Sequence, residues 1–302
     1  MNDPADIAFP NLTVGYMLAK LNSQADRSGV YKMNILVFTS LDDALLDHDS
    51  YSYDAAKAGL EHIRRQQIPM IFTTSKTRVE IERLQSDMQI REPFIAENGA
   101  ALFFQDDYRN FKIDAGFRNP PYTVIHLGAT CSEIRRFVYS VKERFGIKGF
   151  GNLRPDEIEF LTGLSPEHAL LARQREFTEP FLIEYKTKID DMALLAASRG
   201  FKITSGERFF NLAGIRQDKG CAVRLCTQIF TRNTDGSLMT IGLGDSADDI
   251  SMLKCVDIPI LLPRIDGSFE HIDLNNLIKS KHPSSRGWND TLLSVLNSLE
   301  KS

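Results

Sequence analysis

The stretch that most constrains the fold is residues 34–47, where a short apolar run ends in acidic residues. Residues 35–38 have the length and the branched apolar content of a buried strand. Asp42 and Asp43 follow a few residues later. Because ligands of open α/β sheets bind outside the carboxyl ends of parallel strands, this stretch predicts a functional site at a sheet edge.

The segments around this stretch alternate between apolar runs and amphipathic stretches with helical spacing. Strands are predicted at residues 35–38, 68–72, 94–96, 238–243 and 258–262, and helices at residues 53–67, 79–89, 218–230, 250–254 and 291–299. Strands that alternate with helices over short links predict a right-handed parallel sheet.

The middle of the chain departs from this pattern. Strands are predicted there at residues 122–127 and 181–185, and two short strands within residues 201–212 on either side of Gly206. Helices are predicted at residues 132–145 and 190–199. Pro155 and Pro166 suit the first turns of two shorter helices. We therefore predict an α/β fold with an inserted α+β domain: an extension over residues 1–32, a core of residues 33–109 and 213–302, and a cap of residues 110–212.

The composition excludes several classes of function. A net charge of −4 over 302 residues offers no basic excess for nucleic acid or an anionic membrane. No apolar run approaches the roughly 20 residues of a membrane span. The four cysteines form no Cys-x-x-Cys pair, which is typical of reduced core thiols in a cytoplasmic protein.

Four short sites fall at predicted strand ends or helix starts. They contain Ser40 with Asp42, then Thr74, then Lys219, then Asp245 with Asp249. Carboxylates that meet at one sheet edge favour a hard cation such as Mg²⁺, while a lysine and a hydroxyl favour phosphate oxygens. Each site alone also fits a turn or a helix cap. The order of all four favours phosphoryl transfer.

This order resembles that of the haloacid dehalogenase (HAD) superfamily of phosphatases, and more narrowly the mannosyl-3-phosphoglycerate phosphatase family. The resemblance covers about residues 34–262. Its motifs are Thr74-Ser75-Lys76-Thr77-Arg78, Glu97-Asn98-Gly99-Ala100, Leu161-Thr162-Gly163-Leu164, Arg173-Gln174-Arg175-Glu176-Phe177-Thr178-Glu179-Pro180, Gly206-Glu207-Arg208-Phe209-Phe210, Asp218-Lys219-Gly220 and Leu243-Gly244-Asp245.

The resemblance implies a Rossmann-like HAD core with a mobile cap, and hydrolysis with Mg²⁺ through an aspartyl-phosphate intermediate. It implies a phosphorylated sugar or sugar phosphoglycerate as partner. The implied roles are Ser40 at the nucleophile position; Asp42 as general acid/base and, through its carbonyl, metal ligand; Thr74 and Lys219 on the phosphoryl group; Asp245 and Asp249 on the metal; and Lys76, Arg78, Arg175, Glu179 and Arg208 on the substrate.

The chain departs from the family pattern at its first motif. The family's nucleophile is the first aspartate of Asp-x-Asp, and this position is Ser40. Asp43 and Ala44 replace the family's glycine and threonine, and Asp248 replaces its asparagine. A serine hydroxyl is neutral and lacks a dedicated base here, unless Asp42 serves as one.

Two hypotheses follow. The chain is either a Mg²⁺-dependent phosphatase of a mannosyl- or glucosyl-phosphoglycerate, with direct attack by a water that Asp42 or the metal activates. Or it is a pseudophosphatase that binds a phosphorylated sugar or a protein partner without turnover. The retention of Asp42, Thr74, Lys219 and Asp245 favours a working phosphate pocket under either hypothesis.

Overall fold

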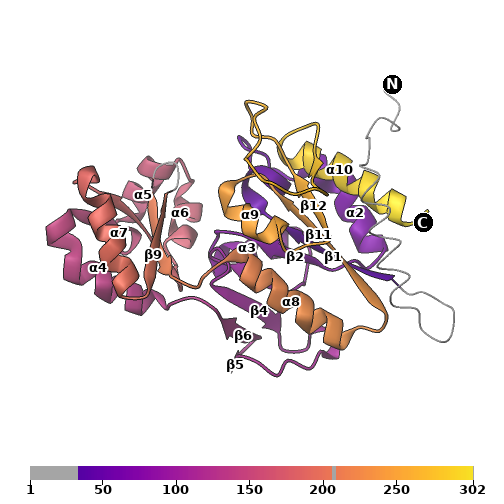
Figure 1. Cartoon of the computed structure of the whole chain (residues 1–302), viewed down its shortest axis with the longest axis horizontal. Helices are drawn as coiled ribbons and strands as arrows, with labels where there is room; N and C mark the ends of the chain where they lie inside the picture. The colour runs from indigo at the N-terminus through magenta and orange to yellow at the C-terminus, as the bar shows by residue number, and fades with distance from the viewer. Residues whose placement is uncertain (1–32, 206–208, 302) are drawn as a thin grey trace. The chain divides into compact units, whose positions relative to one another are not determined.

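The computed structural model describes residues 33–205 and 209–301. The chain forms two compact units (Figure 1). Unit 1 contains the described residues up to Thr74, Asp107–Ile113, and the residues from Lys219 onward; unit 2 contains Ser75–Asp106 and Asp114–Asp218. The predicted extension, residues 1–32, lies outside the described residues, and the predicted boundary between core and cap stays a prediction.

Unit 1 is built on a parallel sheet. Its strands are β1 (Met33–Thr39), β2 (Met70–Thr73), β11 (Ser237–Gly244), β12 (Ile258–Leu261) and β13 (Ile278–Lys279). Their order is β13-β12-β11-β1-β2, and every neighbouring pair is parallel. Strands β1 and β11 are buried along most of their length, as their apolar sequences require. The predicted parallel sheet is therefore confirmed.

Among the described residues of unit 1, four α-helices accompany this sheet. They are α2 (Lys57–Arg65), α8 (Lys219–Asn233), α9 (Ile250–Leu253) and α10 (Ser284–Leu299). Helix α10 packs beside α2, and α8 packs against α9 (Figure 1). The prediction for α10 was too short, because the helix begins at Ser284 and not at residue 291. The added turns carry Trp288, which is fully buried.

Trp288 fastens α10 to the end of strand β1. Its Nε1 donates to Thr39 Oγ1 at 2.9 Å, and the ring lies against Gly59, where an added Cβ would come within 3.0 Å of it. This contact packs a large apolar side chain next to the carboxyl end of strand β1.

Replacing Trp288 with alanine is expected to lower the free energy of unfolding by about 3–5 kcal/mol, because it leaves a cavity as well as losing apolar burial. Urea denaturation monitored by circular dichroism measures this change. The matched variant Trp288→Phe keeps most of the ring and loses the hydrogen bond, so we expect a smaller loss, about 1–2 kcal/mol. Equal losses in the two variants would contradict this account.

The described strands of unit 2 form two antiparallel groups. The first has the order β3-β4-β6-β5: β3 (Phe94–Ala96), β4 (Ala101–Gln105), β5 (Phe117–Asn119) and β6 (Tyr122–His126). The second has the order β7-β8-β10-β9: β7 (Ile147–Gly149), β8 (Thr178–Ile183), β9 (Phe201–Ser205) and β10 (Phe210–Gly214). The short strands β5 and β7 were not predicted, since three residues carry too little periodicity.

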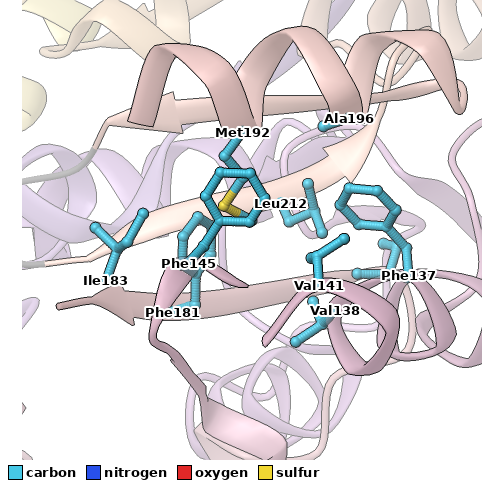
Figure 2. Packing of buried hydrophobic residues seen from close by; sticks show 10 residues of the cluster. Phe137, Val138, Val141, Phe145, Phe181, Ile183, Met192, Ala196 and Leu212 are labelled. Atoms are coloured by element: carbon cyan, nitrogen blue, oxygen red, sulfur yellow. The ribbon is translucent and has the colours of Figure 1, made fainter. Parts of the chain in front are cut away.

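The helices of unit 2 are α3 (Arg78–Asp87), α4 (Cys131–Phe145), α5 (Pro155–Thr162), α6 (Pro166–Ala172) and α7 (Ile189–Ser198). Helix α4 begins with a capping box between Thr130 and Glu133, and ends at Gly146 in the left-handed conformation. Its apolar stripe, with Phe137 and Phe145, packs on β8 and α7 (Figure 2). Because this core covers the apolar face of α4, the opposite face of the helix is the one left for other contacts.

Two further predictions can be compared with the structure. All four cysteines are free thiols, but only Cys131 and Cys226 are buried, whereas Cys221 and Cys255 are partly exposed. Burial raises the pKa of Cys131 to about 12. Within residues 33–205 and 209–301, no helix is long and apolar enough to cross a membrane.

Candidate active site

The register of the parallel sheet brings distant motifs to one edge. Thr39 at the end of β1 is paired with Leu243 of β11 and with Phe72 of β2. The Ser40 N–H then donates to the Leu243 carbonyl at 2.9 Å. Ser40, Thr74 and Asp245 therefore follow three neighbouring strands at the same carboxyl edge, which is the place where the sequence analysis expected a site.

A buried ion pair stands at this edge. Lys219, the first residue of α8, places Nζ 2.7 Å from Asp249 Oδ1, and the two side chains are 4% and 0% exposed. Burial alone would lower the pKa of Lys219, but Asp249 outweighs it and raises that pKa. Burial would raise the pKa of Asp249, but Lys219 and hydrogen-bond donors hold it below its ordinary value. Both side chains are therefore charged at neutral pH.

The second oxygen of Asp249 is also engaged. Oδ2 accepts from the Asp245 N–H at 3.1 Å, from the Ser246 N–H at 3.2 Å and from Ser246 Oγ at 3.0 Å. Gly244 is required here, because a Cβ on it would lie 2.5 Å from the Asp249 Cβ. Asp249 thus orders the loop after β11, and its expected role as a metal ligand stays a prediction.

Sequence reasoning missed this second task of Asp249. The spacing of Ser246 and Asp249 matches a capping box, with a hydroxyl residue followed three positions later by an acceptor. That spacing was a usable signal for a local cap. The pairing with Lys219 crosses from α8 to the loop after β11, so no local spacing reveals it.

Asp245 lies in a strongly negative environment. Burial first, and then the carboxylates of Asp249, Asp43 and Asp42, raise its pKa to about 8, against the opposing effect of Lys219. Crowded carboxylate oxygens are the donor chemistry that suits Mg²⁺, which would relieve this repulsion. Within the described residues, however, no three side chains of His, Cys, Asp or Glu form a group that could hold a metal ion.

The loop after β1 has a feature that the sequence did not reveal. Residues Leu41–Leu45 form one wide turn, η2, closed by the Leu46 N–H donating to the Leu41 carbonyl at 2.8 Å. Asp43 occupies the left-handed region at φ 57°, which is strained for a residue other than glycine. His48 Nδ1 lies 2.7 Å from Asp43 Oδ1 and holds that carboxylate.

The predicted substrate contacts lie in unit 2, and most are engaged there. Arg78 pairs with Glu82 and Glu176 at 2.9 and 2.8 Å. Arg175 Nη1 donates to the Ser75 carbonyl at 2.7 Å. Lys76 is partly buried, Glu179 is fully buried, and Arg208 lies outside the described residues. The substrate roles of these residues stay predictions.

Glu97 joins two of the sequence motifs and was missed as a site residue. Its carboxylate accepts from the Glu176 N–H at 2.8 Å, the Phe177 N–H at 3.3 Å and the Thr178 hydroxyl, with Arg175 Nη1 at 4.0 Å. Burial raises its pKa, while Arg175 and these donors act in the opposite direction. The turn after β3 is thereby fixed to the start of β8.

A parallel sheet with a buried lysine–aspartate pair at its carboxyl edge, together with an α+β unit, is the architecture of the haloacid dehalogenase-like hydrolases. Residues 37–263 match the model of the family described as haloacid dehalogenase-like hydrolase, and the chain belongs to that family. Within it, the chain belongs to the mannosyl-3-phosphoglycerate phosphatase family. The resemblance predicted from the motifs is thus confirmed.

Two relatives support this placement. A glucosyl-3-phosphoglycerate/mannosyl-3-phosphoglycerate phosphatase of Persephonella marina is 45% identical over 88% of this chain and 99% of its own length. A mannosyl-3-phosphoglycerate phosphatase of Pyrococcus horikoshii is 32% identical over 80% of this chain and 94% of its own length. The chain therefore spans nearly the whole of both relatives.

Solved structures agree on the fold. A Thermotoga maritima protein has a TM-score of 0.60 at 13% identity, covering 90% of this chain and 98% of that one. The sucrose-phosphatase of Synechocystis sp. PCC6803 has a TM-score of 0.53 at 12% identity, covering 89% and 98%. At such identities the likeness concerns the fold alone. The predicted α/β core with an inserted α+β cap is confirmed.

Proposed function

We propose that the chain is a Mg²⁺-dependent phosphatase whose substrate is a sugar phosphoglycerate, either glucosyl- or mannosyl-3-phosphoglycerate. The observation that carries the proposal is the 45% identity, over nearly all of both chains, to the Persephonella relative of that name. The buried Lys219–Asp249 pair supports it, because a rigid ammonium at the sheet edge is suited to phosphate oxygens.

In this proposal the chain's own residues bind and orient the phosphoryl group. Lys219 places its charged Nζ at the phosphoryl oxygens, and Thr74, which is buried after β2, offers a hydroxyl. Water attacks the phosphorus atom and gives a proton to the Asp42 carboxylate, which returns a proton to the glycerate oxygen that leaves as its bond to phosphorus breaks. Mg²⁺, held by the Asp245 carboxylate and the Asp42 carbonyl, would supply neutralising charge.

A second candidate function is a pseudophosphatase that binds the same class of substrate without efficient turnover. The observation that favours it is Ser40, which is 6% exposed at the nucleophile position. A neutral hydroxyl provides neither the nucleophilic carboxylate of the family nor its negative charge for a metal. The phosphate-binding residues would then serve recognition.

The experiment that tests both candidates measures phosphate release and substrate binding by the same protein. Calorimetry with each of the two sugar phosphoglycerates reports binding, and phosphate assays with Mg²⁺ or with a chelator report turnover. Binding with slow release supports the pseudophosphatase, and Mg²⁺-dependent release supports the phosphatase. Absence of both binding and release would refute the assigned substrate class.

A further inference from the structure

Two partly exposed cysteines of unit 1 share one arginine, and the function proposed above uses none of these three residues. Arg224 Nη1 donates to Cys255 Sγ at 2.7 Å, and Arg224 Nη2 donates to Cys221 Sγ at 3.0 Å. Both nitrogens are attached to the same guanidinium carbon, so the two sulfur atoms contact one small planar group. Two thiols that are distant in the chain are thereby gathered at one point of the surface.

The arginine has no other partner that would explain its position. Among the residues that the structure describes, its hydrogen bonds are the two to sulfur, and no carboxylate pairs with it. The residue is exposed, although the charged end of an exposed arginine usually extends into water. The interaction with Cys255 is the largest cause that raises the pKa of Arg224. A cation beside a thiol favours the thiolate, which is the reacting form of cysteine.

The fold brings the two cysteines together on packed segments. Cys221 lies in the first turn of α8, and Cys255 follows the end of α9. The two helices pack against each other (Figure 1), and the Gly220 N–H donates to Ser251 Oγ at 3.1 Å. The Cys255 N–H donates to the Met252 carbonyl at 2.9 Å. The backbone therefore holds both thiols near each other, while the side chain that contacts both is exposed and can move into water.

The other two cysteines provide an internal comparison. Cys131 and Cys226 are buried, whereas Cys221 and Cys255 are partly exposed. Burial raises the pKa of Cys131 to about 12, so its sulfur stays a thiol at neutral pH. Because oxidation of cysteine follows thiolate character and exposure, oxidants should reach the pair beside the arginine first.

We propose that Cys221 and Cys255 form an oxidation site, at which hydrogen peroxide converts the two thiols to one reversible disulfide. The Cys255 thiolate, which has the shorter contact with the arginine, attacks one oxygen of the peroxide. The O–O bond breaks, and the leaving oxygen takes up a proton to become water. The Cys221 thiolate then attacks the sulfur of the sulfenic acid, and the S–O bond breaks to release a second water. The peroxide gains the two electrons that the thiol pair loses.

Mass spectrometry of the folded full chain after treatment with hydrogen peroxide tests the proposal. We expect a loss of about two mass units, because two hydrogen atoms leave, and a linked peptide containing Cys221 and Cys255 in a digest without reductant. A phosphine reductant should reverse both changes. Alkylation after unfolding should find Cys131 and Cys226 still reduced. The readout is the covalent state of the chain, so it does not depend on phosphatase activity.

Three variants test the role of each group. Cys221→Ser should leave Cys255 as a sulfenic acid that dimedone traps, because the second thiol is absent. Arg224→Gln should slow disulfide formation about tenfold, since it removes the cation that favours the thiolate. The matched control is Arg232→Gln, at an exposed arginine near the end of the same helix, and it should leave the rate unchanged. Circular dichroism checks that each variant is folded.

Several outcomes would overturn the proposal. A chain that keeps its mass in millimolar peroxide has no such oxidation site. A gain of oxygen without a linked peptide would show that the two sulfurs do not meet, and a linked peptide with Cys131 or Cys226 would assign the reaction to other thiols. Equal rates in Arg224→Gln and Arg232→Gln would refute the role of the arginine.

Discussion

Replacing Ser40 with aspartate should raise the rate of phosphate release by about four orders of magnitude or more. Loss of a nucleophile typically costs 10⁴- to 10⁶-fold, and this substitution restores one. The aspartate carboxylate can form a bond to phosphorus as the bond from phosphorus to the glycerate oxygen breaks, with Asp42 supplying the proton that the leaving oxygen needs. Water then hydrolyses the aspartyl phosphate, which releases phosphate and restores the carboxylate. The position is already buried at the carboxyl end of β1, so the new side chain enters the proposed site directly.

Single-turnover and steady-state phosphate assays on both sugar phosphoglycerates measure this effect. The matched control is Ser40→Asn, which has the size of aspartate without a nucleophilic carboxylate and should remain as slow as the chain with Ser40. An independent readout is a rise of melting temperature with Mg²⁺, which should be larger in Ser40→Asp because a charged oxygen ligand has been added. If Ser40→Asp and Ser40→Asn release phosphate equally, the assignment of position 40 is wrong.

The second large effect concerns the buried pair of Lys219 and Asp249. Lys219→Met should lower the free energy of unfolding by about 3–5 kcal/mol, because it leaves a fully buried carboxylate without its counter-charge. It should also abolish the gain of activity that Ser40→Asp brings, since the ammonium at the phosphoryl oxygens is lost. Urea denaturation gives the first quantity and the phosphate assay the second.

A double variant separates the two effects. Lys219→Met combined with Asp249→Asn removes both charges, while the Asn carbonyl can still accept from the Asp245 and Ser246 N–H groups. Most of the stability should return, but phosphate release should not. Lys254→Met, at an exposed lysine after α9, should change stability by less than about 0.5 kcal/mol. A double variant as unstable as Lys219→Met alone would show that the ion pair is not the cause.

The sequence by itself determined the elements and the class of site. Strands β1 and β11 have short apolar runs, which are typical of buried strands. The acidic and hydroxyl residues that follow them are of the kinds that bind phosphate groups and metal ions. The motifs also identified the family. Ser40 is recognised as the residue at the nucleophile position only because the neighbouring motif residues show where the family's nucleophile lies. These are properties of consecutive residues, which local patterns record well.

Only the tertiary structure decided which side chains become partners. Asp249 was expected on a metal, and the structure shows in addition that its oxygens accept from Lys219 and from the loop after β11. Glu179 was expected to contact substrate, and the structure shows in addition that it is buried and accepts from Arg135. Their roles on metal and substrate stay predictions. These pairings join residues that are far apart in the chain, so they depend on strand register and helix packing. A carboxylate satisfies the nearest donors that the fold supplies, and periodicity along the sequence carries no information about those donors.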